Sequence, residues 1–293
     1  MSRGNHTDVK WPEEARRYEK ERELGAGAVS SVRLVHVRGA VRRKAALKTV
    51  ELTGFDDEKW VRLFRGEVKA LRKLDHPNIV KCLASFEDED SEKRARLLLL
   101  LEYANRGTLE QLITDAYFTK QERLPEAQIW RLFSQIAAAI AHVHEKRILH
   151  CDLKPANVLL HGPQLAVKVC DFGLCRLLSR NSRATQSGYS FASDVWFMGC
   201  ILYEVSGRGK KRVTTDFPLQ MAAGLSPFGG ERTSEFALHL RIRTADFPPL
   251  PDAGGRTPHL KLLVRLCLQL DAGRRPTAVQ LQRFAEKMAA FFE

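Results

Sequence analysis

The chain has 293 residues, enough for one large domain or two fused lobes, and its 44% hydrophobic and 28% charged residues exclude disorder over most of its length. Its longest apolar runs, at residues 97–101 and 136–141, are too short to cross a bilayer, and its N-terminus lacks the apolar segment of a secretory signal. The net charge of +12 permits nucleic-acid binding, but the basic residues are scattered, so we expect a solvated surface with no nucleic-acid and no membrane partner.

The first part of the chain predicts strands around one helix, after a polar leader over residues 1–18. Between about Leu24 and Tyr103 the pattern favours strands. Val32 and Leu34 would share one strand face and Val35 and Val37 the other, and positions 46, 48 and 50 share a face of a later strand. A helix is expected over 60–74, because its apolar stripe falls at positions 60, 64, 67, 71 and 74. Residues 87–95 should form a charged turn between two apolar runs.

The second part of the chain is predicted to be mainly helical. Apolar residues at 129, 133, 136, 140 and 143 indicate an amphipathic helix, and residues 194–203 are apolar nearly all round, as in a buried helix. A further helix is marked by Leu260, Leu263, Cys267 and Leu270. The sequence therefore predicts a small β-rich lobe over about 19–103 and a larger helical lobe over about 104–293.

The cysteines indicate a reducing compartment. No two of the six cysteines have the spacing of metal ligands, and a chain of this length needs no disulfide bonds to be stable. We therefore expect free thiols and a cytoplasmic protein. The cysteines stand at positions 82, 151, 170, 175, 200 and 267.

A glycine-rich turn precedes the strand at Val32. Gly25 and Gly27 would let backbone N–H groups approach phosphate oxygens without an intervening Cβ. An ordinary hairpin is the more common reading of such a turn. Ser30 and Val29 depart from a full phosphate loop, since a third glycine and an aromatic residue would be expected at these two positions.

Lys48 and Glu67 are the misfits on two otherwise apolar faces. Lys48 shares a strand face with Ala46 and Val50, and Glu67 interrupts the stripe of the expected helix. A buried carboxylate needs a counter-charge, whereas an isolated lysine would extend to water. Each residue would neutralise the other, so the sequence predicts an ion pair between them.

The strongest chemical signal lies between two apolar strands at residues 148–160. Asp152 is placed to orient and deprotonate a hydroxyl, Lys154 to hold a phosphoryl oxygen and Asn157 to ligate magnesium through its carbonyl oxygen. Asp171 then offers a second carboxylate at a strand end, and Gly173 turns the chain after it.

Together these motifs resemble those of the protein kinases. The order agrees throughout: glycine loop, strand lysine, helix glutamate, the His-x-Asp-x-Lys-x-x-Asn stretch, Asp-Phe-Gly and Ser-Asp-Val-Trp at 193–196. The resemblance covers about residues 19–290 and implies an α+β, two-lobed protein kinase fold. A lysine two residues after Asp152, as at Lys154, resembles the serine/threonine class of kinases. Ser30 and the stretches 75–80, 200–204, 226–228 and 246–251 resemble the NIMA-related kinases.

The resemblance implies ATP and Mg²⁺ as cofactors and serine or threonine hydroxyls of proteins as substrates. Asp152 and Lys154 would be catalytic, and Asn157 and Asp171 would bind the metal. The resemblance also implies a location at the cytoskeleton within the cytoplasm. The implied ATP-binding residues are Leu24, Gly25, Gly27, Val32, Ala46, Lys48, Glu67, Leu101, Glu102, Ala104 and Leu159.

The same resemblance implies a regulatory spine and a regulatory phosphorylation site. Asp194 would hold the spine from below, and Ser187 matches the serine whose phosphorylation activates relatives. Plain core packing is the alternative role for the apolar spine residues. The spine members would be Leu71, Cys82, His150 and Phe172.

Three departures from the family bear on activity. Cys151 replaces an arginine that meets the phosphorylated activation segment. The activation segment, residues 171–193, is short and lacks the Gly-Thr docking loop and the Ala-Pro-Glu-like motif, so we expect Arg275 to lack its partner. Residues 205–220 read as an insertion, expected to be a basic surface loop that adds nothing to the core.

These departures leave alternatives to an active serine/threonine kinase. One is a nucleotide-binding, pseudokinase-like module that cannot dock substrate. Another is a mis-spliced kinase, in which residues 205–220 are a retained intron and coding sequence after Ser187 is lost. A basic nucleic-acid binder rests on the net charge alone.

Overall fold

The computed structural model describes residues 18–27, 30–37, 43–52, 58–89, 95–120, 122–179, 182, 184–185, 188–207, 227, 242–250 and 256–293. The chain divides into two compact units. Unit 1 comprises Met1–Asp75 and Val80–Tyr103, and unit 2 comprises His76–Ile79 and Ala104–Glu293. The expected leader lies outside the described residues except for Tyr18, which begins the first strand. No helix in the described ranges is long and apolar enough to cross a membrane.

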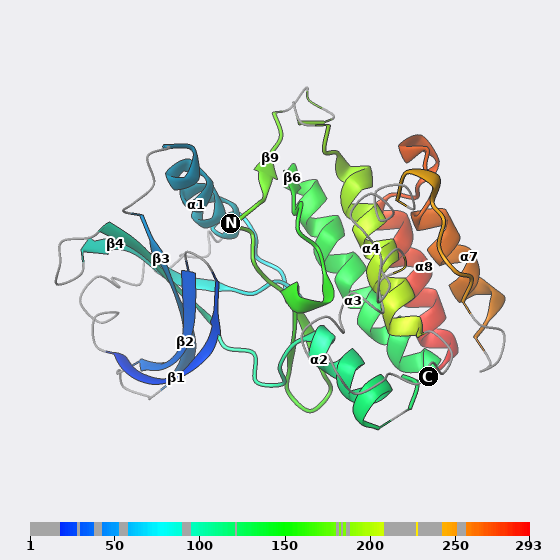
Figure 1. The fold of residues 1–293 in the computed structure, drawn as a ribbon, viewed down its shortest axis with the longest axis horizontal. Coiled ribbons are helices and arrows are strands. Elements are labelled where there is room, and N and C mark those ends of the chain that lie inside the picture. The colour runs from blue at the N-terminus through cyan, green and yellow to red at the C-terminus, as the bar shows by residue number, and fades with distance from the viewer. Residues whose placement is uncertain are drawn as a thin grey trace, which may run out of the picture. The chain divides into compact units, whose positions relative to one another are not determined.

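Unit 1 is a 5-stranded antiparallel sheet in the order β1-β2-β3-β5-β4, with one helix, α1 (Figure 1). The elements are β1 (Tyr18–Ala26), β2 (Ser30–Val37), β3 (Arg43–Glu51), α1 (Glu58–Leu71), β4 (Cys82–Glu89) and β5 (Ala95–Glu102). Side chains alternate between the two faces of these strands, so each face buries its own set. One face holds a core cluster of Val35, Val37, Ala45, Leu47, Leu98 and Leu100.

Two boundaries in unit 1 differ from the expectations. The helix begins at Glu58 and ends at Leu71, not Leu74, because tight turns follow in which Lys73 N–H donates to Ala70 O. Leu74 is nevertheless buried. The charged turn expected over 87–95 is shorter, since Asp88 and Arg96 pair across the strands with Nη2 and Oδ2 3.1 Å apart.

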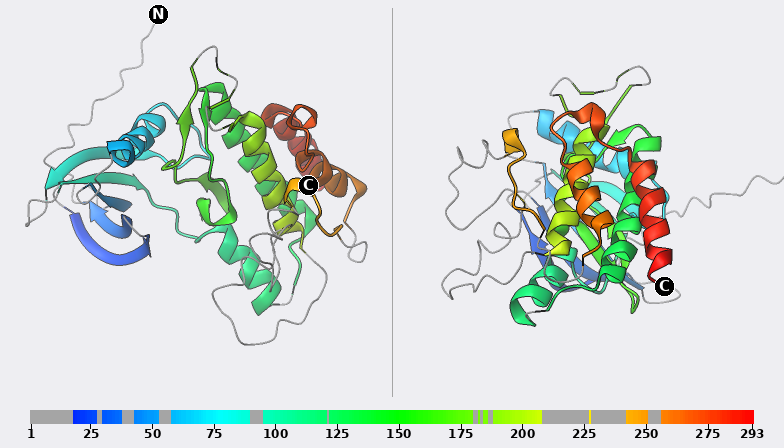
Figure 2. Two further views of the ribbon diagram at one scale, coloured as in Figure 1. Left: turned by 45° about the horizontal axis from the view of Figure 1, so that its top comes forward. Right: turned by 90° about the vertical axis from the view of Figure 1, so that its right-hand side faces the viewer.

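Unit 2 is built around the buried helix α3 (Glu126–Glu145). It packs against α4 (Phe191–Ser206) and α8 (Ala278–Phe291), and α7 (Pro258–Cys267) packs against α4 (Figures 1 and 2). The predicted stripe of α3 is buried at every position, because its apolar spacing matches the helical period. The remaining elements are α2 (Leu109–Thr114), η1 (Asp115–Thr119), β6 (Ile148–Leu149), η2 (Pro155–Asn157), β7 (Val158–His161), β8 (Ala166–Val169), β9 (Arg176–Leu177) and η3 (Ala272–Arg274).

The end of α4 corrects the expectation for the insertion at 205–220. Val205, Ser206 and Gly207 are buried, and the Tyr117 hydroxyl donates to Val205 O at 2.9 Å. The buried Arg256 donates to Ser206 O through Nε at 3.2 Å and Nη2 at 3.0 Å. The first residues of the stretch therefore belong to the core of unit 2, and residues 208–220 lie outside the described ranges. Leu270, expected on the last helix, is exposed because α7 ends at Cys267.

A half-buried carboxyl on α4 predicts a pH-dependent stability. Burial, with the nearby Glu110 charge adding to it, raises the pKa of Glu204 from 4.5 to about 8. Between these values the folded chain binds more protons than the unfolded chain, so the free energy of unfolding falls as pH rises. We expect Glu204→Gln to stabilise the protein by roughly 2 kcal/mol at pH 7 and to remove this slope.

Urea unfolding at pH 5 and pH 8 measures the effect. Glu110→Gln is the matched control, because it removes the neighbouring charge and leaves the Glu204 carboxyl in place; it should reduce the slope only in part. Equal slopes for Glu204→Gln and the unaltered chain would contradict the prediction.

Candidate active site

In unit 1 the strand register gathers several predicted ATP-binding residues on one face of the sheet. Val32 of β2 lies opposite Lys48 of β3, and Ala46 lies opposite Leu101 of β5. Alternation along the strands puts these four side chains on the same face, opposite to the core cluster. The prediction that Ala46 and Lys48 share a strand face is therefore confirmed.

The glycine-rich turn is a tight hairpin between β1 and β2. Gly27 N–H donates to Ser30 O at 2.7 Å, and Gly25 pairs with Val32. A Cβ added at Gly25 would meet nothing within 4 Å, so internal packing does not require glycine there. This open backbone is what a phosphate-binding turn needs. Leu24, at a register shift of β1, is exposed.

Lys48 and Glu67 form the predicted ion pair. Lys48 Nζ lies 2.8 Å from Glu67 Oε1 and 3.0 Å from Oε2, and the two side chains are 11% and 1% exposed. The pair joins β3 to α1 on the face described above. A largely buried cation fixed in this way is suited to hold a phosphate.

Four of the predicted ATP contacts lie at or near the ends of elements. Leu101 and Glu102 end β5, where Glu102 N–H donates to Lys81 O at 2.9 Å. Ala104 begins the long segment of unit 2, and Leu159 lies half-buried on β7, bridged to Thr108. Their contacts to adenine stay predictions.

In unit 2 the predicted catalytic residues form one hydrogen-bonded cluster. Lys154 Nζ donates to Asp152 Oδ2 at 2.8 Å, and Asn157 Nδ2 donates to the same oxygen at 3.0 Å and to Asp152 O at 2.7 Å. The Asp152 side chain is 27% exposed, whereas Asn157 is buried. The cluster thus presents a fixed carboxylate that solvent reaches.

The pairing of β7 with β8 brings the two predicted metal ligands to one end of a ladder. Val158 pairs with Val169, and Cys170 N–H donates to Asn157 O at 2.9 Å, so Asp171 follows directly after a residue bonded to Asn157. Asp171 has φ of +63°, a left-handed conformation that is costly for an aspartate and is found at functional sites. Amide and carboxylate oxygens suit Mg²⁺, so the donor set fits the implied ion.

His150 links the catalytic residue to the strand before Asp171. Its Nε2 donates to Cys170 O at 3.1 Å and its Nδ1 accepts from Asp152 N–H at 3.3 Å. One donating and one accepting nitrogen define a neutral ring, in line with burial, which lowers the pKa of His150. The ring centroid lies 4.8 Å from that of Phe172, as the predicted spine requires. The stacking of the other two members, Leu71 and Cys82 in unit 1, stays a prediction.

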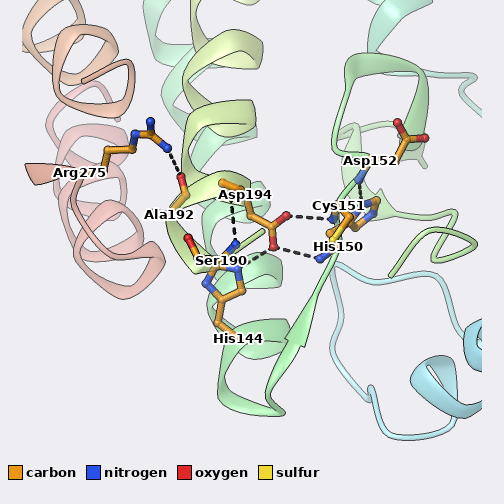
Figure 3. Close-up of polar contacts among 9 residues, drawn as sticks. His144, His150, Cys151, Asp152, Ser190, Ala192, Asp194 and Arg275 are labelled. Carbon is orange, nitrogen blue, oxygen red and sulfur yellow. Dashed lines mark hydrogen bonds and ion pairs between the residues drawn. The ribbon is translucent and has the colours of Figure 1, made fainter. Parts of the chain in front are cut away.

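Asp194 organises the backbone of the catalytic loop (Figure 3). Its Oδ2 accepts from His150 N–H at 2.9 Å and lies 2.8 Å from His144 Nε2, and its Oδ1 accepts from Cys151 N–H at 3.0 Å. Burial alone would raise the pKa of Asp194, but the hydrogen bond and charge of His144, helped by His150, hold it below its usual range. Sequence reasoning missed His144, because a histidine in the last turn of a helix is a common and unspecific feature.

Replacing Asp194 should therefore cost stability. Asp194→Asn would point an amide N–H₂ at backbone N–H donors, so we expect a loss of about 3 kcal/mol in the free energy of unfolding. Denaturant unfolding measures it, with His144→Gln as control, expected to cost about 1 kcal/mol because the backbone bonds to Asp194 survive. A loss below about 0.5 kcal/mol for Asp194→Asn would contradict the assigned role.

The residue at 151 carries no charge for an activation segment to meet. Burial, with the nearby Asp194 charge adding to it, raises the pKa of the Cys151 thiol to about 12, so it stays neutral at physiological pH. Its N–H is committed to Asp194, and its φ is +64°. The cysteine thus gives the backbone hydrogen bond of the position without the positive charge that the kinase resemblance implies there.

The expectation that Arg275 lacks a partner is wrong. Its Nε donates to Gln269 O at 2.7 Å and its Nη2 to Leu270 O at 3.3 Å. Its Nη1 donates to Ala192 O at 2.8 Å (Figure 3). Its Cζ lies 4.8 Å from the centre of the Trp196 ring. Carbonyl oxygens and an aromatic face therefore replace the carboxylate that the kinase resemblance implies.

The short activation segment leads directly into α4. Ala184 and Ser190 form an antiparallel bridge, Thr185 N–H donates to Tyr189 O at 2.8 Å, and Gly188 adopts φ of +82°. Ser190 is the N-cap of α4, and its N–H donates to Ser193 Oγ at 3.0 Å. Ser187 lies outside the described residues, so its regulatory role stays a prediction.

Comparison with known proteins agrees with this geometry. The model of the protein kinase domain matches residues 18–284. The chain is 30% identical over 284 residues to serine/threonine-protein kinase nekl-2 of Caenorhabditis elegans, covering 90% of this chain and 72% of that protein. It is 31% identical to Nek8 of Danio rerio, covering 92% of this chain and 36% of that protein. It is 29% identical to Nek11 of Homo sapiens, with 91% and 40% covered. The chain therefore spans well under half the length of the latter two relatives.

Proposed function

The chain belongs to the protein kinase family, among serine/threonine kinases of the NIMA-related group, and from this we propose that it transfers the γ-phosphoryl group of ATP to serine or threonine hydroxyls of proteins. The proposal rests chiefly on the cluster of Asp152, Lys154 and Asn157, one hydrogen bond away from the strand that leads to Asp171. We propose the cytoplasm as its location, in keeping with the free thiols of the cysteines.

We propose that the described residues hold ATP and Mg²⁺ as follows. Val32, Ala46, Leu101 and Leu159 would contact adenine, and Lys48 would bind phosphate oxygens with its charge fixed by Glu67. Asn157 and Asp171 would ligate the magnesium. When bound, the ion neutralises the charge on the transferring phosphoryl group.

Asp152 would orient the substrate hydroxyl and accept its proton. Both side-chain hydrogen bonds described for this carboxylate go to Oδ2, so we assign Oδ1 to the proton. Lys154 lies against Oδ2 and would contact the transferred phosphoryl group. The neutral His150 supports the loop through Asp152 N–H and takes no proton itself.

Incubating the purified chain with labelled ATP, Mg²⁺ and casein tests the proposal. Label on casein serine or threonine, abolished by EDTA, is the expected result. ATP-Mg²⁺ that raises the unfolding temperature without any transfer would overturn the proposal and favour a nucleotide-binding module. Retention on DNA at moderate salt, with no response to ATP, would favour a nucleic-acid binder.

A further inference from the structure

Arg147 occupies a backbone position where arginine is unfavourable. It follows Lys146, the C-cap of α3, and has φ of +60°. Helices often end in this left-handed conformation, but with glycine or asparagine, because other side chains cost about 1 kcal/mol there. Helix termination alone therefore does not explain an arginine, so its side chain must contribute elsewhere.

The Arg147 side chain contacts the activation segment and the start of α4. Nη2 donates to Ser179 O at 3.0 Å and also to Ser182 O. The guanidinium carbon lies 5.2 Å from the centre of the Phe191 ring, at the first residue of α4. The main chain adds to this, since Arg147 O accepts from Leu178 N–H at 2.8 Å. One residue thus joins the end of α3, the segment after β9 and the start of α4, all within unit 2.

These contacts place the permanently charged guanidinium of Arg147 against the segment, whereas the residue at position 151 is an uncharged cysteine. We propose that Arg147 is the positioning residue that orders Leu178, Ser179 and Ser182, in place of the arginine that the kinase resemblance implies at position 151. Its acceptors are main-chain carbonyl oxygens, so the contact requires no phosphorylation of the segment. The inference deepens the proposed function and rests on it, since it concerns how the same active site is kept in order.

Two variants of Arg147 and one control test the proposal. Arg147→Gly removes the side chain and relieves the backbone strain, whereas Arg147→Lys keeps a cation without the two-pronged guanidinium. Leu165→Gly is the matched control, because Leu165 also has a positive φ, of +54°, and stands in the turn between β7 and β8. Amide hydrogen exchange over 178–185, the unfolding temperature, kcat and KM for ATP are measured on each full chain.

We expect Arg147→Gly to exchange about tenfold faster over 178–185, which corresponds to ~1.4 kcal/mol and to the loss of two hydrogen bonds. Its kcat should fall severalfold with KM for ATP unchanged, because the nucleotide-binding residues are untouched. Arg147→Lys should lie between, and Leu165→Gly should match the unaltered chain in exchange and kcat. The unfolding temperature of Arg147→Gly should stay within about 3 °C, because strain relief offsets the lost contacts.

Exchange in Arg147→Gly equal to that of Leu165→Gly would overturn the inference. So would faster exchange over the whole of unit 2, since that would mean a general structural role. Exchange does not depend on catalysis. If the unaltered chain transfers no phosphate, the proposed function fails, and the exchange measurement alone still decides the role of Arg147.

Discussion

Lys48→Met should abolish the stabilisation of the protein by ATP-Mg²⁺. At a hundredfold excess of ATP over its dissociation constant, binding stabilises a folded protein by about 2.7 kcal/mol. The variant loses the cation that Glu67 holds in place at 2.8 Å, so the response should fall to near zero. A thermal-shift titration with ATP-Mg²⁺ measures it directly.

Lys48→Met should also lower stability without ATP, which calls for a second variant. Glu67 is 1% exposed, and leaving a buried carboxylate without its partner costs about 3–5 kcal/mol. Lys48→Met combined with Glu67→Leu removes both charges and should recover most of this loss, because an apolar pair suits the surrounding face. The double variant should remain unresponsive to ATP. A recovered ATP response would show that the pair serves the fold alone, and would sink the assignment of Lys48 to the phosphates.

The pair was predictable because each partner violates a local pattern. Lys48 alternates with Ala46 and Val50 on a strand face, and Glu67 falls on the apolar stripe of a helix, so each position is wrong unless the other is near. The buried stripe of α3 was predictable from the same helical periodicity, here without a misfit. Where a residue fits its local pattern, or where the partner is backbone, no such signal exists.

Arg147, His144 and Arg275 illustrate that limit. Arg147 and Arg275 donate to main-chain carbonyl oxygens. Every residue has such an oxygen, so no residue type in the sequence identifies the acceptor. His144 bonds Asp194 across fifty positions, and a histidine near a helix end fits many roles. The family pattern even misled for Arg275, because it supplied an expected carboxylate and no rule for what replaces it.

The burial of Val205 and Ser206 was missed for a related reason. A comparison with the family marks where extra residues enter the sequence, but it does not say which residues complete the helix. The α4 helix continues through Ser206 because Arg256 and Tyr117 satisfy its last carbonyl groups. Helix ends depend on such distant donors, so boundaries are harder to predict than the presence of a helix.

Asp152→Asn should abolish turnover while leaving nucleotide binding intact. General-base catalysis by a positioned side chain contributes about 10²–10⁴-fold, so we expect kcat to fall by about this factor. The asparagine oxygen still accepts from Lys154 and Asn157, which keeps the loop in place. Single-turnover phosphoryl transfer measures the loss, and a thermal-shift titration with ATP-Mg²⁺ measures the binding.

Lys154→Met provides the comparison for Asp152→Asn. It removes a charge from the same cluster and leaves the proposed proton acceptor unchanged, so it should retain more single-turnover activity than Asp152→Asn. Equal loss of ATP binding and turnover in Asp152→Asn would mean that Asp152 holds the loop together. Full turnover in the same variant would mean that the hydroxyl proton leaves by another route and that Asp152 Oδ1 does not accept it.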